Sequence, residues 1–184
     1  MACLTSMVNA TDIDYPSLEE IVSSSSRIAR VRILEQERAT YMDQGEHKNC
    51  GIIYTAQVLE SLKGDETKFQ FLAATDQDFA GAEREYLVFA LEAEALGHVD
   101  VEEPDAARVR CRMESAPFLL SERSQVMIPF TKGTGIASTR ERLQITRASA
   151  ISTLPMEEAE IDGCTYGFVE WAAARSAILT AMAN

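Results

Sequence analysis

The sequence predicts a mainly β fold that ends in one amphipathic helix. Between residues 27 and 91, short runs rich in β-branched and aromatic residues alternate apolar with polar side chains, and turn residues separate them. After residue 164 the apolar side chains instead recur at helical spacing. With 184 residues, of which 46% are hydrophobic, the chain is long enough to form one compact core.

In the first half of the chain, a helix cap, turn residues and the alternation of apolar with polar side chains predict one helix and four strands. Ser17 and Glu20 have the spacing of a capping box, which predicts a short helix to about residue 22. The serines at 23–26 are typical of a turn, because their side chains compete for backbone hydrogen bonds. A strand is expected from Arg27 onward, and Lys63-Gly64-Asp65 supplies a tight reversal. Three more strands are predicted at 51–62, 69–73 and 86–91.

The second half of the chain has weaker patterns. An acidic stretch at 97–105 is interpreted as an exposed loop. Strands are expected at 107–113, 124–130 and 142–148, with a glycine-rich reversal at 132–135 between the last two. The terminal helix is predicted from the spacing of Phe168, Trp171, Ala172, Arg175, Ile178, Leu179 and Met182.

The charge balance excludes several kinds of partner. The chain has 17 basic and 29 acidic residues, which gives a net charge of -12. Phosphate backbones and anionic lipid attract the opposite sign, so nucleic acid and membrane surfaces are poor partners. No apolar run approaches the roughly 20 residues that a membrane-spanning helix needs, so membrane insertion is not expected.

Four cysteines, Cys3, Cys50, Cys111 and Cys164, lie far apart, and none forms a CxxC pair typical of zinc or redox sites. An even number allows two disulfides in three connectivities, and four buried free thiols are the alternative. Disulfides are typical of small β domains outside the cytosol, so they favour a periplasmic or secreted protein. The start Met-Ala-Cys fits a chain whose signal peptide has been removed.

Few residues are grouped in a way that indicates a metal-binding or catalytic site. His47 lies near Cys50 and Glu46 in a presumed polar loop, and His98 precedes Asp100 and Glu102. Either group falls short of a full metal-ligand set, so both are kept only as candidate binding residues, without an assigned metal, cofactor or catalytic role. The chain has no GxSxG elbow, and Lys132-Gly133 lacks the order of a phosphate-binding loop.

Two segments, VLESLKGD at 58–65 and YLVFAL at 86–91, carry a family resemblance. Their arrangement resembles the netrin-like, or tissue-inhibitor-of-metalloproteinase-like, OB-fold domains of exported proteins, over roughly residues 3–111. The resemblance implies an OB-like β-barrel domain at 1–113, with residues 114–184 as a C-terminal extension that packs on the barrel. It also implies a Cys3–Cys111 disulfide, which leaves Cys50 and Cys164 to pair with each other or to remain free.

The function expected from these observations is an exported, non-enzymatic binding module with a protein partner. Residues 40–49 and 97–105 are the loops expected to bind it. The resemblance implies one alternative, inhibition of metalloproteases through an N-terminal cysteine amine, although Met1 and Ala2 precede Cys3 here. A second alternative is a metal-dependent hydrolase that uses His47 or His98.

Overall fold

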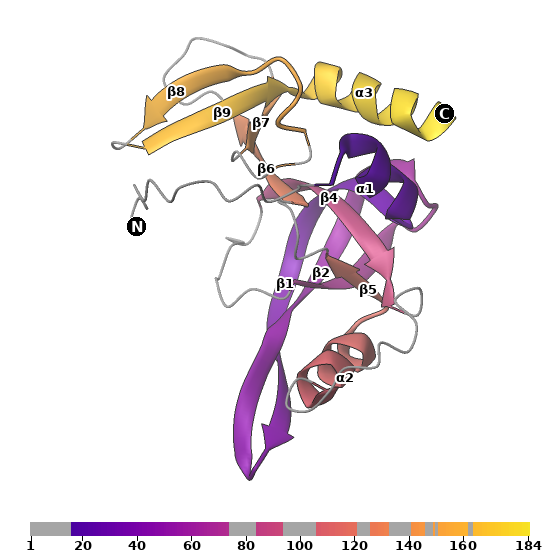
Figure 1. Cartoon of the computed structure of the whole chain (residues 1–184), viewed down its shortest axis with the longest axis vertical. Coiled ribbons are helices and arrows are strands. Elements are labelled where there is room, and N and C mark those ends of the chain that lie inside the picture. Colours follow the sequence, from indigo (N-terminus) through magenta and orange to yellow (C-terminus); the bar gives the residue numbers. More distant parts are fainter. Residues whose placement is uncertain are drawn as a thin grey trace.

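The computed structural model describes residues 16–73, 84–93, 106–120, 126–132, 141–145, 149, 151–161 and 164–184. The described chain is mainly β, with nine strands in one sheet and helices near both ends (Figure 1). In chain order the elements are α1 (Leu18–Ser24), β1 (Arg27–Asp43), β2 (Glu46–Lys63), β3 (Lys68–Ala73), β4 (Glu85–Glu92), α2 (Ala106–Ser115), β5 (Phe118–Leu120), β6 (Met127–Lys132), β7 (Glu141–Ile145), β8 (Glu157–Ile161), β9 (Cys164–Glu170) and α3 (Trp171–Ala183).

The first five strands form a partly closed ring. Their order is β1-β2-β3-β5-β4, and β4 pairs back onto β1 over Arg27–Arg32. All these pairings are antiparallel except that of β3 with β5, which is parallel. The predicted strands at 27 onward, 51–62, 69–73 and 86–91 are therefore confirmed, because each lies in this ring. The reversal after β2 is also confirmed, since Gly64 has a positive φ of 98°.

The last four strands extend the same sheet. β6 pairs with β4 through Tyr86–Val88, and β7, β9 and β8 follow it in that order. The main core cluster runs from the ring into this part, because Leu143, Val169 and Ile178 join the ring residues in it. The ring and the C-terminal strands thus share one hydrophobic core.

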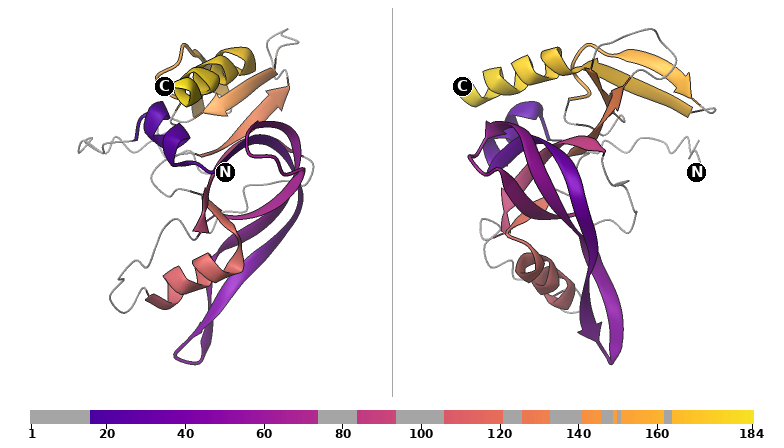
Figure 2. Two further views of the ribbon diagram at one scale, coloured as in Figure 1. Left: turned by 90° about the vertical axis from the view of Figure 1, so that its right-hand side faces the viewer. Right: turned by 180° about the vertical axis from the view of Figure 1, so that it is seen from behind.

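Helix α1 begins with the predicted capping box. The Ser17 Oγ accepts a hydrogen bond of 3.2 Å from the Glu20 backbone N–H, and the Glu20 carboxylate accepts one of 2.7 Å from the Ser17 N–H. The helix buries Leu18, Ile21 and Val22. It lies beside α3 at one end of the ring (Figure 1 and Figure 2).

Two predictions in the second half were wrong. Residues 107–113 form helix α2 instead of a strand, because a buried face of this segment packs on β1 and β2. Phe168 lies in strand β9, and the terminal helix begins only at Trp171. The reversal at 132–135 falls largely on residues outside those that the structure describes.

Arg30 of β1 connects the ring to the C-terminal strands. Its side chain is only 14% exposed, and it donates hydrogen bonds of 2.8 Å to both Glu85 and Glu141. Its guanidinium lies 4.4 Å from the ring centre of Phe130, which packs edge-on against Trp171. Hydrogen bonds to Glu141 and then Glu85 raise the pKa of Arg30 above its usual value. One partly buried cation therefore contacts three elements besides its own, β4, β6 and β7.

Candidate functional site

The most prominent feature of the described surface is a two-stranded arm, defined as residues 34–51. It combines the distal part of β1 with the start of β2 and projects from the ring (Figure 1). β4 pairs with β1 only up to Arg32, and β3 pairs with β2 only from Ile52. Within the described part of the chain, the strands of the arm therefore pair only with each other.

A two-residue turn closes the arm. Gln44 and Gly45 both have positive φ, 49° and 84°, and Asp43 pairs with Glu46 on either side. Positive φ at both central positions matches the right-handed twist of a hairpin. The prediction of a loop at 40–49 was therefore wrong, because a tight turn allows both strands to continue to residues 43 and 46.

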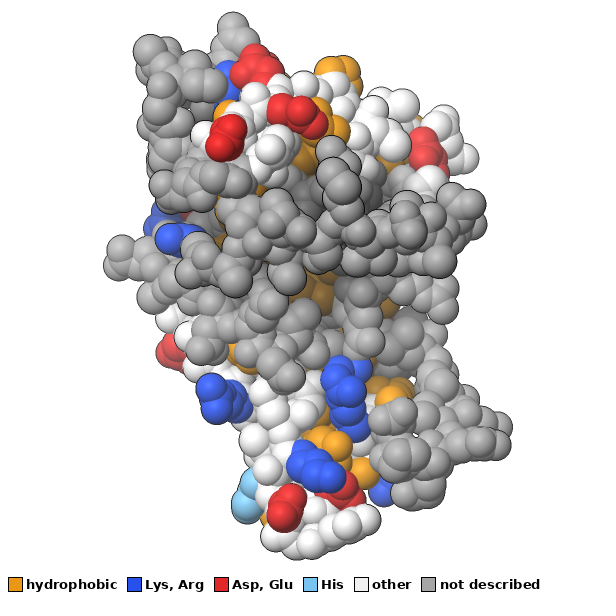
Figure 3. Space-filling model, turned by 60° about the vertical axis from the view of Figure 1, so that its left-hand side comes forward, with side chains coloured by type: hydrophobic (Ala, Val, Ile, Leu, Met, Phe, Trp, Pro, Cys, Tyr) orange, Lys and Arg blue, Asp and Glu red, His pale blue; other side chains and the backbone are white. Residues whose placement is uncertain are grey.

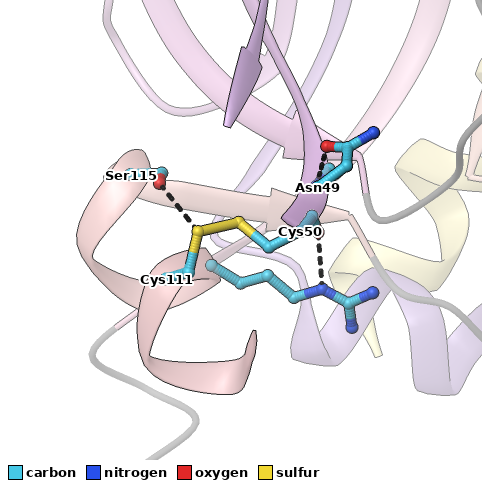
Figure 4. Close-up of a disulfide and its surroundings, with 6 residues drawn as sticks. Asn49, Cys50, Cys111 and Ser115 are labelled. Carbon is cyan, nitrogen blue, oxygen red and sulfur yellow. Dashed lines mark hydrogen bonds between the residues drawn. A yellow bond between two sulfur atoms is a disulfide. The ribbon is translucent and has the colours of Figure 1, made fainter. Parts of the chain in front are cut away.

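A disulfide joins the base of the arm to α2. Cys50 and Cys111 are bonded with their Cα atoms 6.3 Å apart (Figure 4). The register of β1 and β2 shifts at this point, between the pairs Ala39–Gly51 and Thr40–Asn49. Cys50 is thus the extra residue of a bulge, and a bulge redirects a side chain.

This bond corrects the cysteine pairing that the family resemblance implied. A cysteine forms one disulfide, so Cys111 cannot bond Cys3, and Cys50 cannot bond Cys164. Cys3 lies outside the described residues, as does the side chain of Cys164. The bond also removes Cys50 as a metal ligand or thiolate partner for His47, because its sulfur has no free thiolate form.

Further contacts hold α2 against the arm. Arg112 donates a hydrogen bond of 2.8 Å from Nε to the Cys50 carbonyl oxygen, and the Ser115 hydroxyl lies 3.8 Å from the Cys111 sulfur. Around the disulfide, a second hydrophobic cluster includes Ala39, Cys50, Ile53, Leu72, Ala93, Cys111, Ala116 and Leu119, with Tyr41 and Met113 packed against it. The base of the arm, around Ala39 and Cys50, is therefore covered by α2 and shielded from water.

The opposite face and the tip of the arm are exposed. Met42 is 55% exposed, the largest value among the large hydrophobic side chains described. It pairs with His47 across the hairpin, and the ion pair between Asp43 and Lys48 lies beside it and raises the pKa of Lys48. Figure 3 shows Lys and Arg side chains together with hydrophobic ones on the lower half of the molecule. The arm thus offers an apolar residue surrounded by polar groups.

The predicted binding residues are only partly placed. His47 lies on β2 in the arm and is exposed. His98, Asp100 and Glu102 lie outside the described residues, as does the acidic stretch at 97–105. Among the described side chains, no group of three or more His, Cys, Asp or Glu could hold a metal ion.

Gly51 sits where the arm leaves the ring, and we expect Gly51→Ala to destabilise the protein by about 2 kcal/mol. A Cβ there would lie 2.6 Å from the Ala73 carbonyl oxygen and 2.8 Å from a Leu72 methyl group. Gly45→Asn is the control, since nothing lies within 4 Å of that position and Asn tolerates positive φ. Urea denaturation midpoints check both variants, and equal midpoints would contradict the predicted clash.

The chain matches no family model, no curated protein and no solved structure. In the part of the chain that is described, no helix is both long and apolar enough to cross a membrane.

Proposed function

We propose that this chain is an exported, non-enzymatic binding module with an OB-like barrel, and that it contacts a protein partner through the arm. The observation that carries the proposal is the combination of an exposed apolar tip with a base that a disulfide fixes to α2. An isolated two-stranded hairpin is at best marginally stable in water. Bracing such a hairpin lowers the ordering cost of binding, which favours an interaction role.

The strand pattern supports the OB-like part of the proposal. The ring order β1-β2-β3-β5-β4, closed by the pairing of β4 with β1, fits a five-stranded, partly open barrel. The segments VLESLKGD and YLVFAL, which carry the resemblance, lie in β2 with its following turn and in β4. These strands are adjacent to β1 on its two sides.

Two properties support export and a protein partner. The Cys50–Cys111 disulfide fits an oxidising compartment, such as the periplasm or the exterior. The net charge of -12 disfavours nucleic acid and anionic lipid. The exposed edge of β1 between residues 34 and 43 also offers backbone groups that an extended segment of a partner could pair with.

The arm predicts a specific cross-linking pattern. A photo-activatable benzoylphenylalanine at position 42 should cross-link one discrete partner from the extracytoplasmic fraction of the source cells. The same probe at position 182 is the control, because Met182 is also an exposed methionine, at 38%, but lies on α3 at the other end of the molecule. We expect the product at position 42 only.

A substitution then measures the contribution of the tip. Met42→Asp should weaken binding of that partner at least about ten-fold, since central apolar contacts dominate interface energies. Met182→Asp should leave binding unchanged within about two-fold. Circular dichroism checks that both variants are folded. Equal cross-linking from both positions, or equal affinity of both variants, would show that the arm is not the binding element.

A further inference from the structure

The two outer edges of the arm differ in how their backbone groups are bonded. At the base of the arm the β2 edge is occupied, because Arg112 Nε donates a hydrogen bond of 2.8 Å to the Cys50 carbonyl oxygen. The Gly51 N–H beside it donates one of 3.0 Å to the Asn49 side chain. The outer edge of β1 from residue 34 to residue 43, called the open edge below, pairs with no strand that the structure describes. It is therefore the longer of the two edges that could take an added strand.

The open edge lacks features that commonly block a sheet edge. Proline removes a backbone donor and lysine repels an incoming strand, but residues 34–43 contain neither. β1 carries an extra residue only at Leu34, at the end of the open edge next to the ring. The open edge is also longer than a typical strand of roughly five or six residues. Its length and regularity thus suit pairing with an extended segment.

One face of the open edge carries a cation and an apolar side chain. Successive side chains of a strand point to opposite faces. Ala39 and Tyr41 pack in the second hydrophobic cluster, so Arg38 and Met42 point to the opposite face, where both are exposed. Arg38 forms no ion pair with any residue that the structure describes. Its charge is therefore available to a residue of an added strand.

The other face of the open edge is acidic next to Arg38. Glu35 and Glu37 alternate with Ala39, and both are exposed. Opposite charges directly across two strands stabilise their pairing, and like charges destabilise it. A complementary antiparallel strand therefore has an acidic residue opposite Arg38 and basic residues opposite Glu35 and Glu37.

A second copy of this chain is a poor occupant of the open edge. When two identical edges pair antiparallel, one residue faces its own copy across the two-fold axis. An axis at Arg38 places two guanidinium groups opposite each other, and an axis at Glu37 does the same with two carboxylates. An axis at Gln36 places Glu35 opposite Glu37. Two molecules of net charge -12 also repel each other, so the charges favour a different protein as the occupant.

We propose that the open edge of the arm takes an added antiparallel strand from a protein partner. The segment that binds is apolar at both ends, facing Leu34 and Met42, which are 41% and 55% exposed. Between these ends it carries the acidic and basic residues that complement Arg38, Glu37 and Glu35. Main-chain hydrogen bonds supply the affinity, and the charged pairs set the register. This inference rests on the function proposed above and specifies the kind of segment that the arm binds.

The test uses the full chain and two synthetic peptides of equal composition and net charge. The first, acetyl-Val-Thr-Val-Thr-Glu-Lys-Val-Lys-Leu-amide, places its Glu opposite Arg38 and its two Lys opposite Glu37 and Glu35. The control peptide exchanges the Glu with the Lys that follows it, so that like charges face each other at Arg38 and Glu37. Hydrogen exchange followed by NMR reports which amides of the chain each peptide protects.

The first peptide, at millimolar concentration, should protect alternate amides of β1 between residues 34 and 43. Alternate N–H groups of a strand point to its outer edge, so this pattern distinguishes an added strand from a contact between side chains alone. The control peptide should bind at least about five-fold more weakly, because two attractive cross-strand pairs become repulsive.

Variants separate the register from general attraction to an acidic protein. Arg38→Glu should abolish the preference between the two peptides, since each then has one repulsive pair at positions 37 and 38. Arg110→Glu makes the same charge change at an exposed position of α2 and should leave the preference unchanged.

Equal binding of the two peptides, equal effects of the two variants, or no protection of alternate β1 amides would each overturn the added strand. If the probe at position 42 still gives one discrete cross-link, the arm binds its partner in another way and the proposed function stands. Loss of that cross-link would instead count against the arm itself.

Discussion

Removing the disulfide with Cys50→Ala and Cys111→Ala should lower the free energy of unfolding by about 4 kcal/mol. The bond closes a loop with a sequence separation of 61 residues, so its loss gives the unfolded chain much more conformational freedom. Both sulfurs are buried, with residues 1% and 8% exposed, and alanine fits their apolar surroundings better than serine does. Since α2 and the arm meet at this bond, both should lose protection first.

Urea denaturation measures the global effect, and hydrogen exchange measures its location. Substitution is preferable to a reducing agent, because it acts on the Cys50–Cys111 bond alone, whereas a reductant is not selective among the four cysteines of the chain. Ser115→Ala is the control, since it removes only a hydroxyl 3.8 Å from the Cys111 sulfur, and it should cost less than about 0.5 kcal/mol. A loss below about 1 kcal/mol in the double variant would mean that packing alone holds α2 on the arm.

Arg30→Met should destabilise the protein by about 3 kcal/mol. Methionine retains most of the apolar contact with Phe130 but removes the charge that compensates Glu85, whose side chain is only 11% exposed. Arg32 remains 3.1 Å from Glu85 but is itself exposed, so it replaces only part of the compensation that Arg30 gives this largely buried carboxylate, and this accounts for the large cost.

Arg32→Met is the matched control for this prediction. Arg32 also contacts Glu85, at 3.1 Å, but it is 43% exposed and has no aromatic partner among the described contacts. Its loss should cost no more than about 1 kcal/mol, as for other exposed ion pairs. Thermal and urea unfolding of the two variants, measured side by side, test this prediction. Similar losses of stability would show that the burial of Arg30 does not add to its contribution.

The strands of the ring could be predicted because their side chains follow the sheet period. In β1, Ala29, Val31 and Ile33 are buried, while Arg30 and Arg32 between them are not fully buried. The short helix α1 could be predicted from two residues, since the capping box is a local interaction. The sequence therefore predicted those elements that are determined by residues close together in the chain.

Helix α2 could not be predicted from alternation alone. Val109, Cys111 and Met113 alternate with Arg108, Arg110 and Arg112, which is the period of a strand. Ala, Arg, Met and Glu are nevertheless strong helix formers, and in this segment that preference agrees with packing onto the arm. Helix propensity was the signal that could have identified it.

The candidate site depends on contacts that cannot be predicted from the spacing of residues in the sequence. The pairing of Cys50 with Cys111 follows from a bulge in β2, and sequence offers three equivalent connectivities. The arm did have a local signal, because Gln44-Gly45 can form a two-residue hairpin turn, although this pair is less typical than Asn-Gly. The exposure of Met42 depends on how far both strands extend beyond the ring.

The closure of the ring through β1 and β4 has a consequence for folding speed. β1 can pair with β2 as soon as the hairpin between them forms, but its other edge has to wait for Glu85–Ala90 far along the chain. Bringing such distant segments together costs entropy before any contact compensates it, so we expect refolding in milliseconds to seconds. A nascent chain emerging from the ribosome would expose the unpaired backbone edge of β1 and its apolar side chains until β4 is synthesised. Chaperones that recognise extended apolar segments would bind the chain at this stage.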